Sequence, residues 1–297
     1  MPPPKQVKWF IPFIVIAPLL LSLPSLADSS NEIVISASRI AVTKAASGNS
    51  VTVLDTDFLQ QHQIRTVSDA LRFIPGVVVN HSGGIGTLGE VRIRGAEANQ
   101  TLVLIDGIEV NDVASGSAFN FSHLLNLDIE RIEVLRGAQS ALWGSDAMGG
   151  VVNVMTKTGR GPAKVSVSLE AGWFETHQGI FNISRGNRHY SYSLGGTLMS
   201  TDGISVASAG IEEDGYRHTT LNFKGGLQAT ENVALDIVVR RTKDRVELDA
   251  GGADSTATAD TEQKFNRMGV SWGTLAGRWR HGVSVSDAKT ERVYVSP

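Results

Sequence analysis

The residues of this chain that are best suited to direct chemistry are acidic side chains in two separate stretches. Residues 211–216 read IEEDGY and contain Glu212 and Asp214, and a later polar stretch contains Asp244 and Asp249. Carboxylate oxygens are the ligands that Ca²⁺ prefers in proteins. These four residues are therefore candidate calcium ligands, and the alternative is a pair of solvated acidic loops that bind no ion.

A glycine-rich stretch resembles a nucleotide-binding motif by its spacing. Residues 84–89, GIGTLG, fit the pattern G-x-G-x-x-G. That motif binds a dinucleotide only where a helix opens at its end, whereas residues 90–94 alternate in the manner of a strand. The stretch is therefore interpreted as a flexible turn.

The composition gives no support to an enzyme. The chain has no cysteine, which excludes thiolate catalysis, disulfides and cysteine-bound zinc. Its seven histidines show no spacing typical of metal ligands, and neither H-E-x-x-H nor G-x-x-x-x-G-K occurs. We therefore expect no catalytic residue and no cofactor, apart from calcium in the acidic loops.

The elements that must position these loops begin with a small mixed α/β unit at residues 51–158. Its two longest motifs, residues 91–107 (VRIRGAEANQTLVLIDG) and 130–157 (ERIEVLRGAQSALWGSDAMGGVVNVMTK), each show a strand, Arg-Gly, a turn and a second strand. Thr66 is a suitable N-cap, and residues 67, 70, 71 and 74 then share one apolar helical face. Pro75-Gly76 ends that helix, and strands are expected at 51–54 and 77–79.

Residues 163–297 have a different character. Apolar and polar side chains alternate through about seven segments, for example at 164–170 and 233–240. Short turns at 186–187, 230–231 and 276–277 alternate with longer acidic connections at 202–216 and 244–262. Alternating faces and alternating loop lengths are typical of an antiparallel transmembrane β-barrel. A soluble β-sandwich, which also alternates, is the other interpretation.

The N-terminus resembles an export signal. Lys5 and Lys8 precede an apolar run at 10–23, and Ser25-Leu26-Ala27 places small residues at both positions that a signal peptidase reads. We expect residues 1–27 to be removed, and a membrane anchor is the alternative. Removal leaves 25 basic against 30 acidic residues, a net charge of about −5, which is not the profile of a nucleic-acid-binding protein.

Residues 28–50 join this signal to the α/β unit. They contain a short β-prone segment followed by a linker of small residues at 41–50. Such a segment can add as a strand to the sheet edge of a partner, and a leader without function is the alternative. The segment consists of Glu32, Ile33, Val34, Ile35, Ser36 and Ala37.

The two long motifs resemble the plug domain of TonB-dependent outer-membrane receptors, with cobalamin transporters as the nearest variant. The resemblance lies in IRG with LVLIDG and in RIEVLRG with WGSDAMGGVVNV. It implies a plug followed by a barrel in the outer-membrane lipid, with residues 32–37 as the TonB box that binds the partner TonB. The implied function is active uptake of cobalamin, or of a siderophore or haem. A passive barrel or adhesin is the alternative from another class.

The same resemblance implies roles for individual residues. Arg94 and Arg136 correspond to the plug arginines that pair with barrel carboxylates as a plug–barrel lock. Calcium is expected to order the extracellular loops. Glu90 and Glu97 depart from the family, which usually has short neutral polar side chains there. The implied ligand contacts are Leu88, Glu90, Glu97, Ser115 and Gly116.

Strand number predicts that the chain is the N-terminal part of a receptor. A barrel that encloses a plug needs about 22 strands, whereas the sequence indicates about seven. We therefore expect a plug beside a curved open sheet, in which Arg94 or Arg136 lacks some barrel partners.

Overall fold

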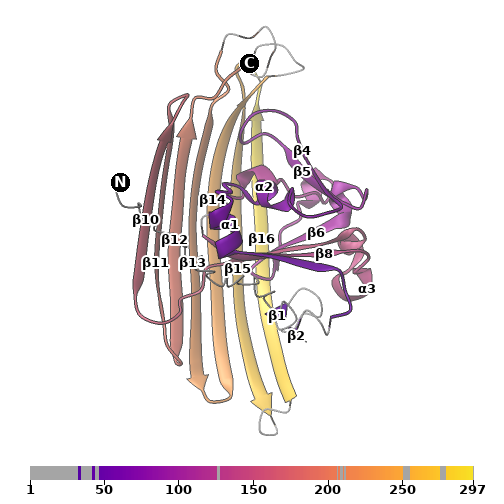
Figure 1. The fold of residues 1–297 in the computed structure, drawn as a ribbon, viewed down its shortest axis with the longest axis vertical. Helices are drawn as coiled ribbons and strands as arrows, with labels where there is room; N and C mark the ends of the chain where they lie inside the picture. The colour runs from indigo at the N-terminus through magenta and orange to yellow at the C-terminus, as the bar shows by residue number, and fades with distance from the viewer. Residues whose placement is uncertain are drawn as a thin grey trace, which may run out of the picture.

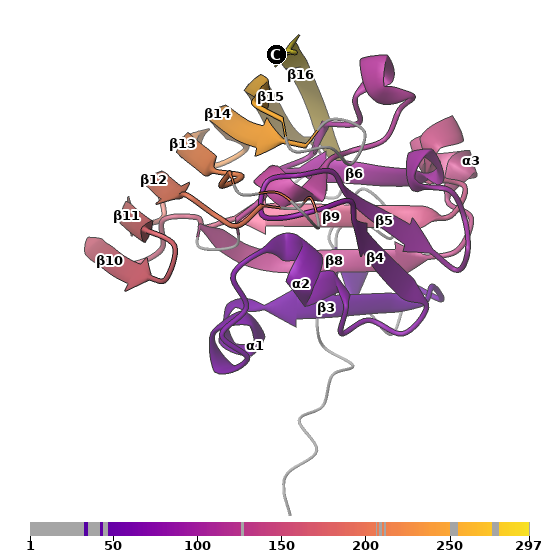
Figure 2. The ribbon, with the colours of Figure 1, turned by 90° about the horizontal axis from the view of Figure 1, so that it is seen from above.

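The structure, a computed structural model, describes residues 33–34, 42–43, 47–125, 128–205, 207, 210, 212–249, 255–274 and 279–296. It consists of an α/β domain and a long antiparallel sheet, and Figures 1 and 2 show the domain on the concave side of the curved sheet. The predicted fold class is thereby confirmed. No helix in the described part of the chain is long and apolar enough to cross a membrane.

The α/β domain contains a five-stranded sheet in the order β3-β8-β9-β6-β7. Strands β6 and β9 run parallel, and the other neighbours are antiparallel. A separate hairpin pairs β4 with β5, and a two-residue pair joins β1 to β2. The strands are β1 (Ile33–Val34), β2 (Val42–Thr43), β3 (Val51–Asp55), β4 (Val77–His81), β5 (Gly89–Ile93), β6 (Thr101–Ile105), β7 (Ile108–Glu109), β8 (Ile129–Arg136) and β9 (Gly150–Thr156).

Short helices connect these strands. Thr66 caps α2 as predicted, because its side chain accepts a hydrogen bond from the Asp69 amide. The apolar face at positions 67, 70, 71 and 74 is buried in the main core. The helices are α1 (Thr56–Gln61), α2 (Val67–Leu71) and α3 (Ser140–Trp143), with 3₁₀ turns η3 (Ala98–Gln100), η4 (Val113–Ser115), η5 (Phe121–His123) and η6 (Ser145–Ala147).

The two similar sequence motifs fold differently. Strands β8 and β9 of the second motif are neighbours in one sheet, whereas β5 and β6 of the first motif belong to different sheets. Arg94 and Gly95 both adopt a positive φ directly after β5, and η3 follows before β6 begins. This turn redirects the chain, so that β6 pairs with β9 instead of β5.

Seven antiparallel strands form the long sheet in chain order, and the described residues pair its outer strands, β10 and β16, on one side only. The 202–216 connection is confirmed, but the predicted loop at 244–262 is wrong in its bounds. Residues 244–248 continue β14 and pair with 257–261, so the connection covers only 249–256. The strands are β10 (Lys164–Gly172), β11 (Thr176–Gly186), β12 (Tyr190–Thr201), β13 (Tyr216–Thr230), β14 (Val233–Leu248), β15 (Ala257–Thr274) and β16 (Trp279–Val295).

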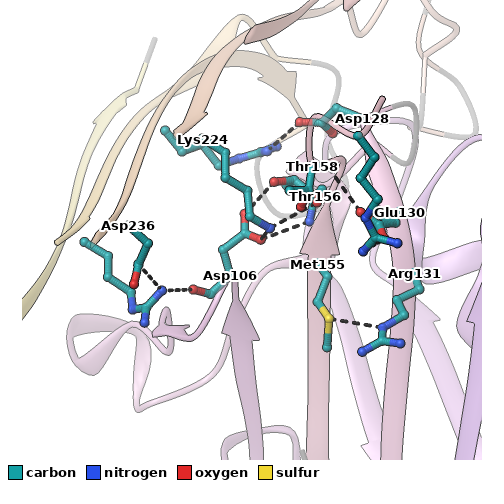
Figure 3. Close-up of polar contacts among 12 residues, drawn as sticks. Asp106, Asp128, Glu130, Arg131, Met155, Thr156, Thr158, Lys224 and Asp236 are labelled. Carbon is teal, nitrogen blue, oxygen red and sulfur yellow. Dashed lines mark hydrogen bonds and ion pairs between the residues drawn. The ribbon is translucent and has the colours of Figure 1, made fainter. Parts of the chain in front are cut away.

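Buried ion pairs join the α/β domain to the long sheet. The Asp128 carboxylate lies 3.1 Å from Arg240 Nη1, and both side chains are at most 6% exposed. Lys224 Nζ lies 2.6 Å from Asp106 Oδ1. Asp106 also accepts hydrogen bonds from the amide and hydroxyl of Thr156. Figure 3 shows the carboxylates at the ends of domain strands, facing the sheet.

These contacts predict that Arg240→Met loosens the domain from the sheet. The substitution leaves Asp128 buried without its cation, and breaking a buried pair in this way costs about 3 kcal/mol. Hydrogen exchange of the α/β domain during urea titration of the purified protein measures the loss. The matched control is Lys243→Met on the same strand, whose side chain is 73% exposed, and an equal effect of both substitutions would contradict the prediction.

Candidate functional site

A cavity of about 320 Å³ lies between the α/β domain and the ends of strands β14–β16. The long connections 202–215 and 249–256 lie at this same end of the sheet, which we call the apical end. Two domain loops contribute, the first apical loop (residues 82–88) and the second (residues 111–118). The lining includes Ser82, Thr87, Leu88, Glu90, Ser115, Phe119, Asn120 and His123 from the domain, and Val246, Leu248, Ala259, Thr261, Arg292 and Tyr294 from the sheet.

The structure brings three of the five predicted ligand contacts together. Leu88, Glu90 and Ser115 line the apical cavity. Gly116 is the next residue and ends η4 in a left-handed conformation. Glu97 does not line the cavity but forms a capping box with Gln100 at η3.

Charged side chains of the site are paired with one another. Arg92 lies between Glu90, at 3.3 Å, and Glu97, at 3.2 Å, which accounts for the two glutamates that depart from the family pattern. Arg292 of β16 donates to the Ser115 hydroxyl at 2.7 Å and lies 3.6 Å from Asp112. The sheet thereby contacts the second apical loop directly. The cavity combines apolar surface with fixed polar groups, a composition suited to noncovalent binding.

Glycines allow the first apical loop to approach its neighbours. Gly86 has a φ of +86°, and a Cβ there would lie 2.2 Å from the ring of Tyr216. A Cβ at Gly89 would lie 2.5 Å from the Ser122 hydroxyl and 3.2 Å from the His81 ring. Burial, followed by the charge of Arg72, lowers the pKa of His81. The G-x-G-x-x-G stretch therefore serves packing, and it continues into strand β5 and not into a helix.

Three of the four candidate calcium ligands gather at the apical end. Carboxylate oxygens of Glu212, Asp214 and Asp249 lie within 4.8 Å of one another. Asp249 also accepts hydrogen bonds from the amides of Ala207 and Ser255, so it ties the two apical connections together. Three carboxylates at this spacing suit a hard cation.

Asp244 does not belong to this acidic group, and its prediction as a loop ligand is wrong. It lies within β14, fully buried, and accepts hydrogen bonds at 2.6 Å from the Tyr216 hydroxyl and from His218 Nδ1. The alternation of β14 continues past the position at which the sequence indicates a loop. Asp244 therefore faces the α/β domain and not the solvent.

The predicted TonB box lies mostly outside the described residues. Of its six residues, Ile33 and Val34 are described, and they pair with Thr43 and Val42. The Val34 side chain is fully buried in a core cluster with Val51 and Leu135. Glu32, Ile35, Ser36 and Ala37 lie outside the described residues.

The two predicted lock arginines have no partner on the described part of the long sheet. Arg136 donates to the Pro75 carbonyl at 2.7 Å and to the Thr52 hydroxyl at 3.2 Å, both within the domain. Arg94 is exposed, and no ion pair joins it to a described residue of the sheet. Two of the observed pairs, Asp128–Arg240 and Asp106–Lys224, have the opposite polarity, with a domain carboxylate facing a sheet cation. Arg65 of the domain, in contrast, pairs with Glu170 of β10. The arginine lock stays a prediction.

Sequence reasoning missed the contribution of the sheet to the site. Arg292 and Tyr294 come from the last strand, and His123 and Tyr216 come from segments more than 90 residues apart. No local pattern signals such pairs. Residues 269–273, GVSWG, also fit the nucleophile motif G-x-S-x-G, which requires a strand-to-helix turn. They lie inside β15, where Ser271 pairs with Ala234, so they form no nucleophile site.

Comparisons with known proteins agree with this arrangement. Residues 43–151 match the family model of the TonB-dependent receptor plug domain. The chain is 30% identical over 250 residues to the vitamin B12 transporter BtuB of Vibrio vulnificus (strain CMCP6), an alignment covering 81% of this chain and 41% of the relative. The chain thus spans less than half the length of that relative.

Solved structures share the fold at low sequence identity. The ferripyoverdine receptor of the outer membrane of Pseudomonas aeruginosa superposes with a TM-score of 0.73 at 14% identity, over 89% of this chain and 37% of that one. The alcaligin outer-membrane receptor FauA of Bordetella pertussis gives 0.72 at 15%, over 89% and 43%. The chain therefore belongs to the TonB-dependent outer-membrane receptors, and its described residues form their plug domain and seven strands of their barrel wall.

Proposed function

We propose that the receptor containing this chain takes up cobalamin across the outer membrane by TonB-dependent transport. The observation that carries the proposal is the apical cavity, in which Leu88, Glu90 and Ser115 meet β14–β16. The named function of the relative that is 30% identical, vitamin B12 transport, supports cobalamin as the ligand.

A siderophore is the second candidate ligand, because the solved structures with a similar fold include receptors for ferripyoverdine and alcaligin. Their identities of 14% and 15% support a shared fold and do not extend to the ligand. Haem is a third candidate of the same class. A passive barrel is disfavoured, because an open pore has no need of a plug bound to its wall by buried ion pairs.

Energy coupling is proposed to run through residues 32–37. A β-prone segment ahead of the plug can pair with an edge strand of TonB, with backbone hydrogen bonds providing the affinity. The pairing of Ile33 and Val34 with β2 supports the tendency of this segment to form a strand.

Calcium is proposed to order the apical connections. Glu212, Asp214 and Asp249 would hold the ion, since their oxygens already converge. The ion would offset the repulsion of the three carboxylates and fix both connections above the cavity.

The cavity predicts that Leu88→Asp weakens cyanocobalamin binding at least tenfold, because a carboxylate replaces apolar contact area with a charge that must be desolvated. Equilibrium binding of cyanocobalamin, a ferric siderophore and haem to the purified receptor tests ligand and site together. The control is Val113→Asp on the second apical loop, which is 84% exposed and outside the cavity lining. Tight binding of the siderophore or haem, with no binding of cyanocobalamin, would reject the proposed ligand.

The acidic group predicts that chelation of calcium lowers ligand affinity and that Asp214→Asn removes this dependence. Loss of one carboxylate weakens a three-carboxylate site strongly, because charge count sets calcium affinity. Glu213→Gln serves as the control, since Glu213 is the adjacent exposed residue and not a member of the group. Affinity that is indifferent to chelator in the unmodified receptor would refute the calcium site.

The coupling segment predicts that Ile35→Pro abolishes uptake in cells while leaving ligand binding intact. Proline removes a backbone donor from a strand that must pair with its partner. Ala46→Pro in the adjoining linker should leave uptake unchanged. Normal uptake by the Ile35→Pro variant would show that residues 32–37 are not the TonB box.

A further inference from the structure

A continuous series of hydrogen bonds, half-buried at its start and buried at the barrel wall, connects the first apical loop to the wall. It begins at Asn120, whose Oδ1 accepts from the amide of Gly89 at 2.9 Å and from the amide of Ser122 at 3.1 Å. The side-chain nitrogen of Asn120, Nδ2, lies 3.1 Å from His123 Nε2. The Asn120 side chain therefore binds both Gly89, the residue that follows the first apical loop, and the imidazole of His123.

The series continues into strands β13 and β14. His123 Nδ1 lies 3.3 Å from the Tyr216 hydroxyl and 3.3 Å from Asp244 Oδ1. Tyr216 donates to the same Asp244 oxygen at 2.6 Å, and His218 Nδ1 lies 2.6 Å from it. The side chains of His123, His218 and Asp244 are at most 3% exposed.

The donor and acceptor atoms available to these side chains determine which group donates in each hydrogen bond of the series. Because Asn120 Oδ1 already accepts two backbone amides, its nitrogen must be the group facing His123, and an amide nitrogen only donates. His123 Nε2 must then accept, which places the ring proton on Nδ1. That proton points to Tyr216 and Asp244, so every donor leads toward the Asp244 carboxylate. Charge-assisted bonds of this kind stabilise a buried carboxylate.

The loop also packs directly on the same tyrosine. Gly86 lies against the Tyr216 ring so closely that no Cβ fits between them, and that ring stacks between those of His123 and His218. Gly86 and Gly89, the two attachment points, flank Thr87 and Leu88, which line the apical cavity.

We propose that His123, Tyr216 and Asp244 are positioning residues that hold the first apical loop against the barrel wall and so shape the ligand cavity. They act on the loop through Asn120 and Gly86. Tyr216 and Asp244 lie outside the cavity lining, whereas His123 also lines it. The expected effect of these residues on ligand affinity rests on the proposed binding function of the cavity. Their expected effect on the order of the loop does not depend on any ligand.

The absence of cysteine from the chain permits a direct test with one spin label at Ile85→Cys, a loop position that is 54% exposed and outside the cavity lining. Tyr216→Phe keeps the ring against Gly86 but removes the hydroxyl. In the purified receptor it should raise label mobility and weaken cyanocobalamin binding about three- to tenfold, the effect of one buried hydrogen bond. Tyr190→Phe on β12, whose ring stacks on Tyr192 far from the loop, should change neither quantity.

Asp244→Leu, which removes the terminal acceptor, should raise the mobility of the label at least as much, and Asp244→Asn, which retains an acceptor oxygen, should restore part of the order. Label mobility that stays unchanged in both Tyr216→Phe and Asp244→Leu would overturn the inference, even if cyanocobalamin binds normally. A receptor that does not bind cyanocobalamin but shows the mobility changes would reject the proposed ligand and support the positioning role.

Discussion

A carboxylate buried between a plug and a barrel wall cannot remain ionised unless cations or hydrogen-bond donors surround it. Three such carboxylates, of Asp106, Asp128 and Asp244, lie at this interface. Lys224 and Arg240 balance the first two, and donors from Tyr216 and His218 surround the third. Lys224 and Arg240 lie on wall strands of fixed register, so pairing both with plug carboxylates limits how the plug can be seated. Asp244 belongs to the wall itself and contacts the plug through His123, at 3.3 Å. The cavity at the apical end follows from that seating.

The polar contacts between the plug and the wall are made at a few discrete points. Lys224 of β13 and Arg240 of β14 face the plug carboxylates of Asp106 and Asp128, and Arg267 of β15 donates a hydrogen bond to the Asp106 carbonyl (Figure 3). Removing the cation of such a pair leaves its carboxylate buried without a partner, which destabilises the seated plug.

Local patterns predicted much of this fold because local physics decides it. Alternation identified the long strands, and the Thr66 cap and its apolar face located α2. Strand ends and strand partners depend on distant segments. The sequence therefore places Asp244 in a loop, and it does not indicate that β6 pairs with β9. The site shows the same division. The family resemblance implied Leu88, Glu90 and Ser115, which line the apical cavity, whereas Arg292 and the Asn120–Asp244 series join segments that only the folded chain brings together.

The two apical plug loops and wall strands β14–β16 together line the apical cavity in which we propose that the ligand binds. A structure of the receptor with bound cyanocobalamin, determined by crystallography or electron cryomicroscopy, tests this claim most directly. The account predicts ligand density between Leu88, Ser115 and Arg292, with Asn120 still bonded to His123. Density elsewhere on the receptor, or a plug detached from Lys224 and Arg240 in the resting state, would contradict it.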